Sequence, residues 1–76
     1  MSEEAPSRAE HLAWCKQRAL EYVELGKLNQ AVTSMSSDLT KHPDTARLVV
    51  MSLMAVGMFE VPNGPAAVRR WIEGIN

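Results

Sequence analysis

The stretch LVVMSLMAVGMF, residues 48–59, constrains the fold more than any other part of the chain. Apart from Ser52 it holds only apolar residues and one glycine, so its side chains would point in all directions around a helix. A helix that is apolar all round has to be covered all round. The run is too short to span a bilayer, which takes about 20 apolar residues. We therefore expect it at the centre of a helical domain, covered by other helices or by a second copy of the chain.

Local signals predict where the first helix begins and ends. Ser7 with Glu10 three residues later is a capping-box pattern, which places the helix start at Arg8. Gly26 is expected to end the helix, because glycine tolerates the left-handed conformation that closes many helices. One face of this helix is an apolar stripe with three- and four-residue spacing, made of Leu12, Cys15, Ala19, Tyr22 and Val23.

A second helix is predicted over residues 28–41, after a very short turn, so that the two helices form an antiparallel hairpin. Pro43 cannot continue this helix and disfavours a helical conformation at His42. The apolar stripe of the second helix consists of Leu28, Ala31, Val32, Met35 and Leu39. Its other face is polar and is expected to be solvated; it consists of Asn29, Thr33, Ser34, Ser37 and Asp38.

Two further helices complete the predicted domain. The third is capped by Asp44 or Thr45 and ends at Gly57 or Met58. A turn over residues 62–65 then leads into a fourth helix, which begins at Pro65 and ends near Glu73. The apolar side of the fourth helix holds Val68, Trp71, Ile72 and Ile75. The sequence thus predicts an all-α fold, a small bundle of four short helices arranged as two helical hairpins around the third helix.

Length and composition narrow the class of protein. A chain of 76 residues is at most one domain, and we expect a single helical domain over residues 7–76 behind a flexible polar tail over residues 1–6. The only cysteine, Cys15, excludes an internal disulfide and favours the cytoplasm. The net charge of −1 and the scattered basic residues predict no nucleic-acid partner. The acidic N-terminus lacks the pattern of a signal peptide, and no contact with a membrane is expected.

Residues 19–43 resemble a single tetratricopeptide repeat. Gly26, Ala31 and Pro43 stand at the offsets where that repeat ends its first helix, brings its helices into close contact and ends its second helix. The first helix departs from the pattern, because Cys15 and Arg18 stand where the repeat has an aromatic residue and a leucine. The resemblance implies one tetratricopeptide-like helical hairpin and not a repeat array, since arrays need at least three units.

The chain as a whole resembles small helical proteins encoded by bacteriophages. The segments that carry this resemblance are HLAWCK at 11–16, SSDL at 36–39, KHP at 41–43 and RWIEG at 70–74. The resemblance implies a viral source and offers no site residue. Because phages use compact proteins of this size to block host or defence machinery, it also implies a host protein as the partner.

No arrangement of residues predicts catalysis or metal binding. His11 and Cys15 share a helix face, and His42 is a third residue able to bind zinc, but the CxxC or HxxxH pair of a structural zinc site is absent. A Cys15 nucleophile with a histidine base would project from a regular helix without oxyanion donors. The sequence has no glycine-rich loop after a strand, and therefore no phosphate-binding loop is predicted. The sequence predicts no metal, no cofactor and no enzymatic activity.

Two groups of residues are candidates for contact with a partner protein. Trp14 and Arg18 lie one turn apart, away from the apolar stripe, and both residue types are common at binding hot spots. Arg69 and Arg70 form a compact basic pair able to hold a phosphate or an acidic residue. The structural alternatives are that a neighbouring helix covers Trp14, and that the arginine pair complements a helix C-terminus.

Self-association is predicted through the apolar run, with Met51, Met54 and Met58 in the contact. We thus expect a non-catalytic protein–protein interaction module that forms a homo-oligomer and, given the phage resemblance, binds and inhibits a host protein or defence complex. Two other functions stay open. One is a self-assembling structural part of a virion or scaffold, and the other is an oligomer whose arginines sequester an anionic small molecule.

Overall fold

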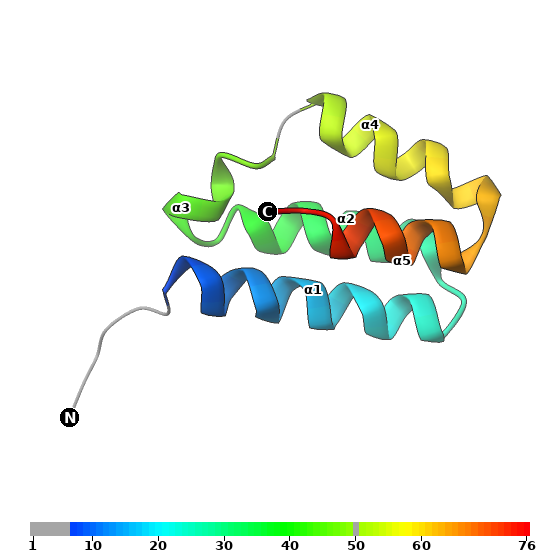
Figure 1. The fold of residues 1–76 in the computed structure, drawn as a ribbon, viewed down its shortest axis with the longest axis horizontal. Helices are drawn as coiled ribbons and strands as arrows, with labels where there is room; N and C mark the ends of the chain where they lie inside the picture. The colour runs from blue at the N-terminus through cyan, green and yellow to red at the C-terminus, as the bar shows by residue number, and fades with distance from the viewer. Residues whose placement is uncertain (1–6, 50) are drawn as a thin grey trace.

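The computed structural model of the chain describes residues 7–49 and 51–76, without the side chains of Met51 and Ser52. The tail predicted over residues 1–6 lies outside the described residues. All elements in the described part are helical, and Figure 1 shows them packed as a small bundle. They are α1 (Arg8–Glu24), α2 (Leu28–Leu39), α3 (Pro43–Ala46), α4 (Met51–Glu60), the short 3-10 helix η1 (Val61–Asn63) and α5 (Pro65–Glu73).

Helix α1 begins and ends at the predicted signals. The Ser7 hydroxyl accepts a hydrogen bond from the Glu10 backbone N–H at 3.1 Å, and the Glu10 carboxylate accepts one from the Ser7 N–H at 2.8 Å. At the other end Gly26 has a φ of 75°, and the N–H groups of Gly26 and Lys27 donate to the carbonyls of Val23 and Tyr22. This is a complete Schellman motif, which satisfies carbonyls that the helix end leaves without partners.

Helix α2 ends at Leu39, two residues before the predicted end at 41, and Thr45 satisfies the carbonyl of its last residue. The Thr45 hydroxyl is buried and donates to the Leu39 carbonyl at 2.6 Å, so this oxygen is satisfied from outside the helix. His42 is extended, as expected for a residue before proline, with φ −130° and ψ 131°. Its Nδ1 accepts a hydrogen bond from the Asp44 N–H at 3.0 Å. His42 therefore caps α3, and the prediction that Asp44 or Thr45 does so is wrong.

The single helix predicted from a cap at Asp44 or Thr45 to Gly57 or Met58 is also wrong, because the chain forms α3 and α4 with a break between them. The two helices pack on different neighbours, α3 on α1 and α4 on α2 and α5. In the break, Leu48 and Val49 are half-buried and pack against the core. One straight helix could not place α3 beside α1, α4 beside α5 and these two side chains against the core.

The core lies between α1, α2 and α5, and α4 packs on the outside of this three-helix unit (Figure 1). The placement of the apolar run at the centre of the bundle is therefore wrong. The predicted stripes do form the core; its buried members are Leu12, Cys15, Ala19, Val23, Ala31, Val32, Met35, Leu39, Val68, Trp71, Ile72 and Ile75. Within the described residues no helix combines the length and apolar character needed to cross a membrane.

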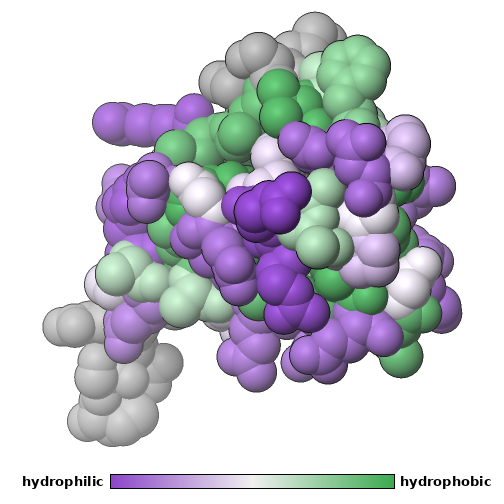
Figure 2. Space-filling model, turned by 45° about the vertical axis from the view of Figure 1, so that its right-hand side comes forward, coloured by the Kyte–Doolittle hydropathy of each residue, from purple (hydrophilic) through white to green (hydrophobic). Residues whose placement is uncertain are grey.

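Helix α4 is attached to α5 through Gly57 and Trp71. A Cβ atom at Gly57 would lie only 2.6 Å from the Trp71 ring, so the missing side chain is what allows the indole to come this close. The Trp71 Nε1–H also donates to the Leu53 carbonyl at 3.2 Å. The opposite side of α4 remains exposed at Val56, Met58 and Phe59. Figure 2 shows apolar surface along the upper edge of the molecule, where α4 lies.

Candidate functional site

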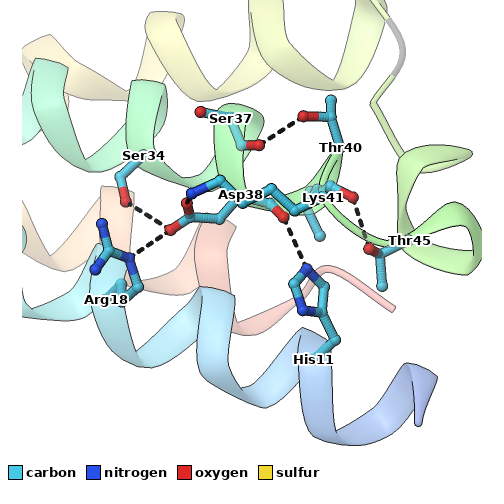
Figure 3. Close-up of polar contacts among 9 residues, drawn as sticks. His11, Arg18, Ser34, Ser37, Asp38, Thr40, Lys41 and Thr45 are labelled. Carbon is cyan, nitrogen blue, oxygen red and sulfur yellow. Dashed lines mark hydrogen bonds and ion pairs between the residues drawn. The ribbon is translucent and has the colours of Figure 1, made fainter. Parts of the chain in front are cut away.

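A buried carboxylate at the junction of α1 and α2 organises the polar surface of this protein. Asp38 is only 2% exposed, although it was expected on a solvated helix face. Its Oδ2 lies 2.7 Å from Arg18 Nε, and its Oδ1 lies 3.1 Å from Lys41 Nζ. The Ser34 hydroxyl donates to Oδ2 at 3.3 Å, so both carboxylate oxygens have partners (Figure 3). The expectation is wrong because Asp38, next to the buried Leu39, lies at the edge of the face that α2 turns toward α1.

The charge state of Asp38 follows from these contacts. Burial by itself raises the pKa of the carboxyl, because water no longer solvates the charge. The hydrogen bonds and positive charges of Arg18 and Lys41 outweigh burial, so the pKa lies below its ordinary value. The group is therefore ionised at neutral pH, and it fixes two cations at the surface.

Those two cations flank the exposed indole of Trp14. Trp14 is 41% exposed, with Arg18 Cζ 5.0 Å and Lys41 Nζ 5.6 Å from its ring centroid, both within cation–π range. The centroid of the His11 ring lies 5.3 Å away on a tilted plane. We call these four residues, His11, Trp14, Arg18 and Lys41, the Trp14 cluster. The structure thus brings together Trp14 and Arg18, which the sequence singled out, and leaves Trp14 at the surface.

His11 ties the cluster to the end of α2. Its ring is buried, and Nε2 lies 2.8 Å from the carbonyl oxygen of Asp38. Because a carbonyl can only accept, Nε2 carries the proton in this contact. The His42 ring lies 5.3 Å from the His11 ring, which brings the start of α3 against the same corner of the molecule. One side chain of α1 thereby holds α2 and the chain leading to α3 in place.

A shallow groove of about 260 Å³ lies beside the cluster, between α1 and α2. Its lining is formed by Arg18, Tyr22, Gln30, Thr33, Ser34, Ser37, Asp38 and Lys41. Arg18 and Lys41 belong to both features, so the two side chains link the Trp14 ring to the groove. Apart from Arg18, sequence reasoning missed these residues as a site. The one available signal was the three-residue spacing of Asp38 and Lys41, which places them on one helix face.

The other predicted site residues lie elsewhere. Arg69 is half-buried and Arg70 is exposed on α5, and neither side chain forms a hydrogen bond, ion pair or ring contact with another described residue. Of the methionines expected in self-association, Met54 packs partly against the core and Met58 is exposed. The side chain of Met51 lies outside the described part of the chain.

The environment of Cys15 disfavours the thiolate that a nucleophile requires. Its side chain is fully buried. Burial, followed by the negative charge of Asp38, raises the pKa of the thiol to about 11, so the reactive thiolate is scarce at neutral pH. Among residues 7–49 and 51–76, no group of three or more His, Cys, Asp or Glu side chains is arranged to hold a metal ion.

No protein family, curated protein or solved structure matches this chain.

Proposed function

We propose that this domain is a non-catalytic protein-binding module and that the Trp14 cluster is its contact surface. The observation that carries the proposal is an exposed indole flanked by two cations, both anchored on one buried carboxylate. Tryptophan and arginine are the residue types most enriched at binding hot spots. An exposed indole beside an ordered guanidinium offers a partner both apolar area and charge-assisted hydrogen bonds.

The anchoring supports binding because it lowers the cost of association. Fixing a long side chain at an interface costs about 0.5–1.5 kcal/mol in lost rotamer freedom. Arg18 and Lys41 are already held by Asp38, and His11 by the Asp38 carbonyl, before a partner arrives. Because these side chains are already ordered in the free protein, they are better suited to contact a partner than side chains that move freely in solvent.

The resemblance to bacteriophage proteins extends the proposal to the partner. We infer that the domain acts in the host cytoplasm, where it binds a host protein or defence complex and blocks its activity. The buried thiol of Cys15 favours a binding role over a cysteine-dependent activity of the domain's own.

Affinity capture with matched variants tests this function. The immobilised wild-type domain should retain a specific protein from a bacterial lysate, and Trp14→Ala should reduce its recovery by about tenfold or more, since hot-spot truncations cost at least about 2 kcal/mol. Glu24→Gln, an exposed change near the other end of α1, should capture as well as the wild type. A captured protein that binds Trp14→Ala equally well, with the variant folded by circular dichroism, would show that the contact surface lies elsewhere.

Self-association is a second candidate function, favoured by the exposed apolar side of α4. Phe59 is 76% exposed, and Val56 and Met58 are each 47% exposed. No charged residue occurs between positions 51 and 59, so two copies of α4 would meet without charge repulsion. On this proposal the apolar run contacts a second copy of the chain through Met58 and Phe59, and not through Met54, which packs against the core.

A further inference from the structure

We propose that the groove between α1 and α2 receives a carboxylate from an acidic segment of the partner protein, with an apolar neighbour of that carboxylate placed on Trp14. This inference rests on the proposed function and gives the chemistry of the partner. It starts from the charges at the groove: Arg18 and Lys41 share the single carboxylate of Asp38, so two positive charges face one negative charge. Among the residues that line the groove, positive charge is therefore in surplus, which favours an anionic group.

Arg18 has donors left for such a group. Its Nε is used by Asp38, and neither terminal nitrogen of the guanidinium forms a hydrogen bond with another described residue. The Arg18 side chain is 44% exposed, so these nitrogens are accessible to a ligand. Figure 3 shows the guanidinium turned so that only one edge meets Asp38. A guanidinium fixed in this way can hold a second carboxylate through two parallel hydrogen bonds.

The rest of the groove suits the same group. The Ser37 hydroxyl, the Tyr22 phenol and the Gln30 amide line it, and none of these side chains forms a hydrogen bond with another described residue. They can donate to a carboxylate oxygen or satisfy the backbone of a bound segment. A volume of about 260 Å³ fits a single side chain and not a large cofactor.

The position of Trp14 defines the neighbouring residue of the partner. Because Arg18 and Lys41 both contact the indole and line the groove, a carboxylate in the groove leaves the adjacent partner residue close to the exposed part of the indole. An apolar side chain there would gain contact area on the ring. The expected segment therefore combines acidic and apolar residues.

Glu21 provides a test in which removal of a charge should strengthen binding. It lines a second hollow of about 240 Å³ together with Arg18, Tyr22 and Leu25, and its charge acts on the Arg18 guanidinium. Glu21 does not line the groove itself. An incoming carboxylate would feel repulsion from Glu21, so removal of this charge should strengthen binding, whereas a purely apolar partner would be indifferent to it.

The experiment is an NMR titration of the full chain with two short acetylated and amidated peptides, one of alternating glutamate and leucine and one with glutamine in place of glutamate. The glutamate peptide should shift the Trp14 indole, the Arg18 Nε–H and the amides of Ser34 and Ser37, and added salt should weaken the effect. Arg18→Lys keeps the charge opposite Asp38 but loses the two free nitrogens, and it should weaken binding by about tenfold. Glu21→Gln should strengthen binding by about twofold to fivefold.

Three results would overturn the inference: no shift up to millimolar peptide, equal shifts with the glutamine peptide, or shifts centred on the amides of Arg69 and Arg70. The amide spectrum of each variant shows whether it is folded. Failure of this inference is distinct from failure of the proposed function. If capture depends on Trp14 but the affinity does not change with Arg18→Lys or Glu21→Gln, the domain is still a binding module, and the proposal of an acidic partner is wrong. Capture independent of Trp14 removes the contact surface itself.

Discussion

Among the charged side chains, Asp38 should contribute most to the stability of the fold. It is buried, and two cations and a hydroxyl surround its carboxylate. We predict that Asp38→Asn lowers the free energy of unfolding by about 2 kcal/mol, as expected for hydrogen bonds to a charged group. The amide keeps the shape of the side chain but loses the charge that holds Arg18 and Lys41. Urea denaturation followed by circular dichroism measures the change.

The matched control for this substitution is Asp44→Asn, since Asp44 is exposed and Asp38 is not. The control should change stability by less than about 0.5 kcal/mol. Equal effects of the two substitutions would mean that the ion pairs at Asp38 contribute no more than a surface charge.

The same residue predicts a pH dependence. The pKa of Asp38 is lower in the folded protein than in the unfolded chain, so the folded state binds fewer protons between the two values. The stabilisation is therefore fully present above about pH 4, where an unfolded aspartate is ionised, and it is lost as the pH falls through the folded pKa. The difference in stability between wild type and Asp38→Asn should shrink below about pH 4. The exposed Glu10, whose pKa is lowered by its hydrogen bonds with Ser7, contributes equally to both proteins and cancels.

Cys15 gives a prediction about local opening. The buried thiol, with a pKa raised to about 11, should react with iodoacetamide at pH 8 far more slowly in the folded protein than in urea. The residual rate should follow the population of opened molecules, because only those expose the thiol. Mass spectrometry of timed aliquots measures it. Labelling of the folded protein as fast as of a free thiol would contradict the burial of this position.

At the scale of elements, α4 depends on one close contact. Gly57→Ala would gain up to about 1 kcal/mol from helix propensity alone. We predict a net loss of about 1–3 kcal/mol, since the added Cβ overlaps the Trp71 ring and forces α4 away from α5. Thermal unfolding of Gly57→Ala beside Ala55→Gly, an exposed position on the same helix, separates packing from propensity. A stabilised Gly57→Ala would show that α4 does not lie against Trp71.

Element boundaries were predictable where the signal is local, and not where the cause is a tertiary contact. Ser7 with Glu10, Gly26 and Pro65 act on their own backbone neighbours, and each marks an observed boundary. The break after α3 has no such signal in the apolar residues that follow it. It exists because α3 and α4 pack on different helices.

The candidate site was predictable only in part for a similar reason. The residue types of Trp14 and Arg18 singled out two of the four residues that the structure brings together in the Trp14 cluster. Asp38 stands among serines and threonines, so its sequence neighbourhood indicates a solvated face. The burial of Asp38 depends on which residue of α1 lies opposite it. The pattern of side chains along α2 alone does not determine how the two helices are aligned.

At the scale of the whole molecule, the exposed side of α4 predicts that the solution mass of the protein depends on its concentration. Light scattering across a dilution series should give a dimer that dissociates on dilution. Phe59→Glu should be monomeric throughout with unchanged helix content, because Phe59 is largely exposed and a charge there would have to be buried at the contact. Gln17→Glu, an exposed change on α1, should behave as the wild type. A wild type that is monomeric at every concentration would contradict the second candidate function.

The two tryptophans stand in opposite surroundings, and this makes the protein its own fluorescent reporter. Trp14 is exposed beside two cations that attract an anionic quencher such as iodide, whereas Trp71 is enclosed between α4 and α5 and donates to a backbone carbonyl. Iodide should therefore quench the red-shifted emission of Trp14 and leave the blue-shifted emission of Trp71. Protection of the first signal would report occupancy of the cluster, and a red shift of the second would report detachment of α4, in one unlabelled sample.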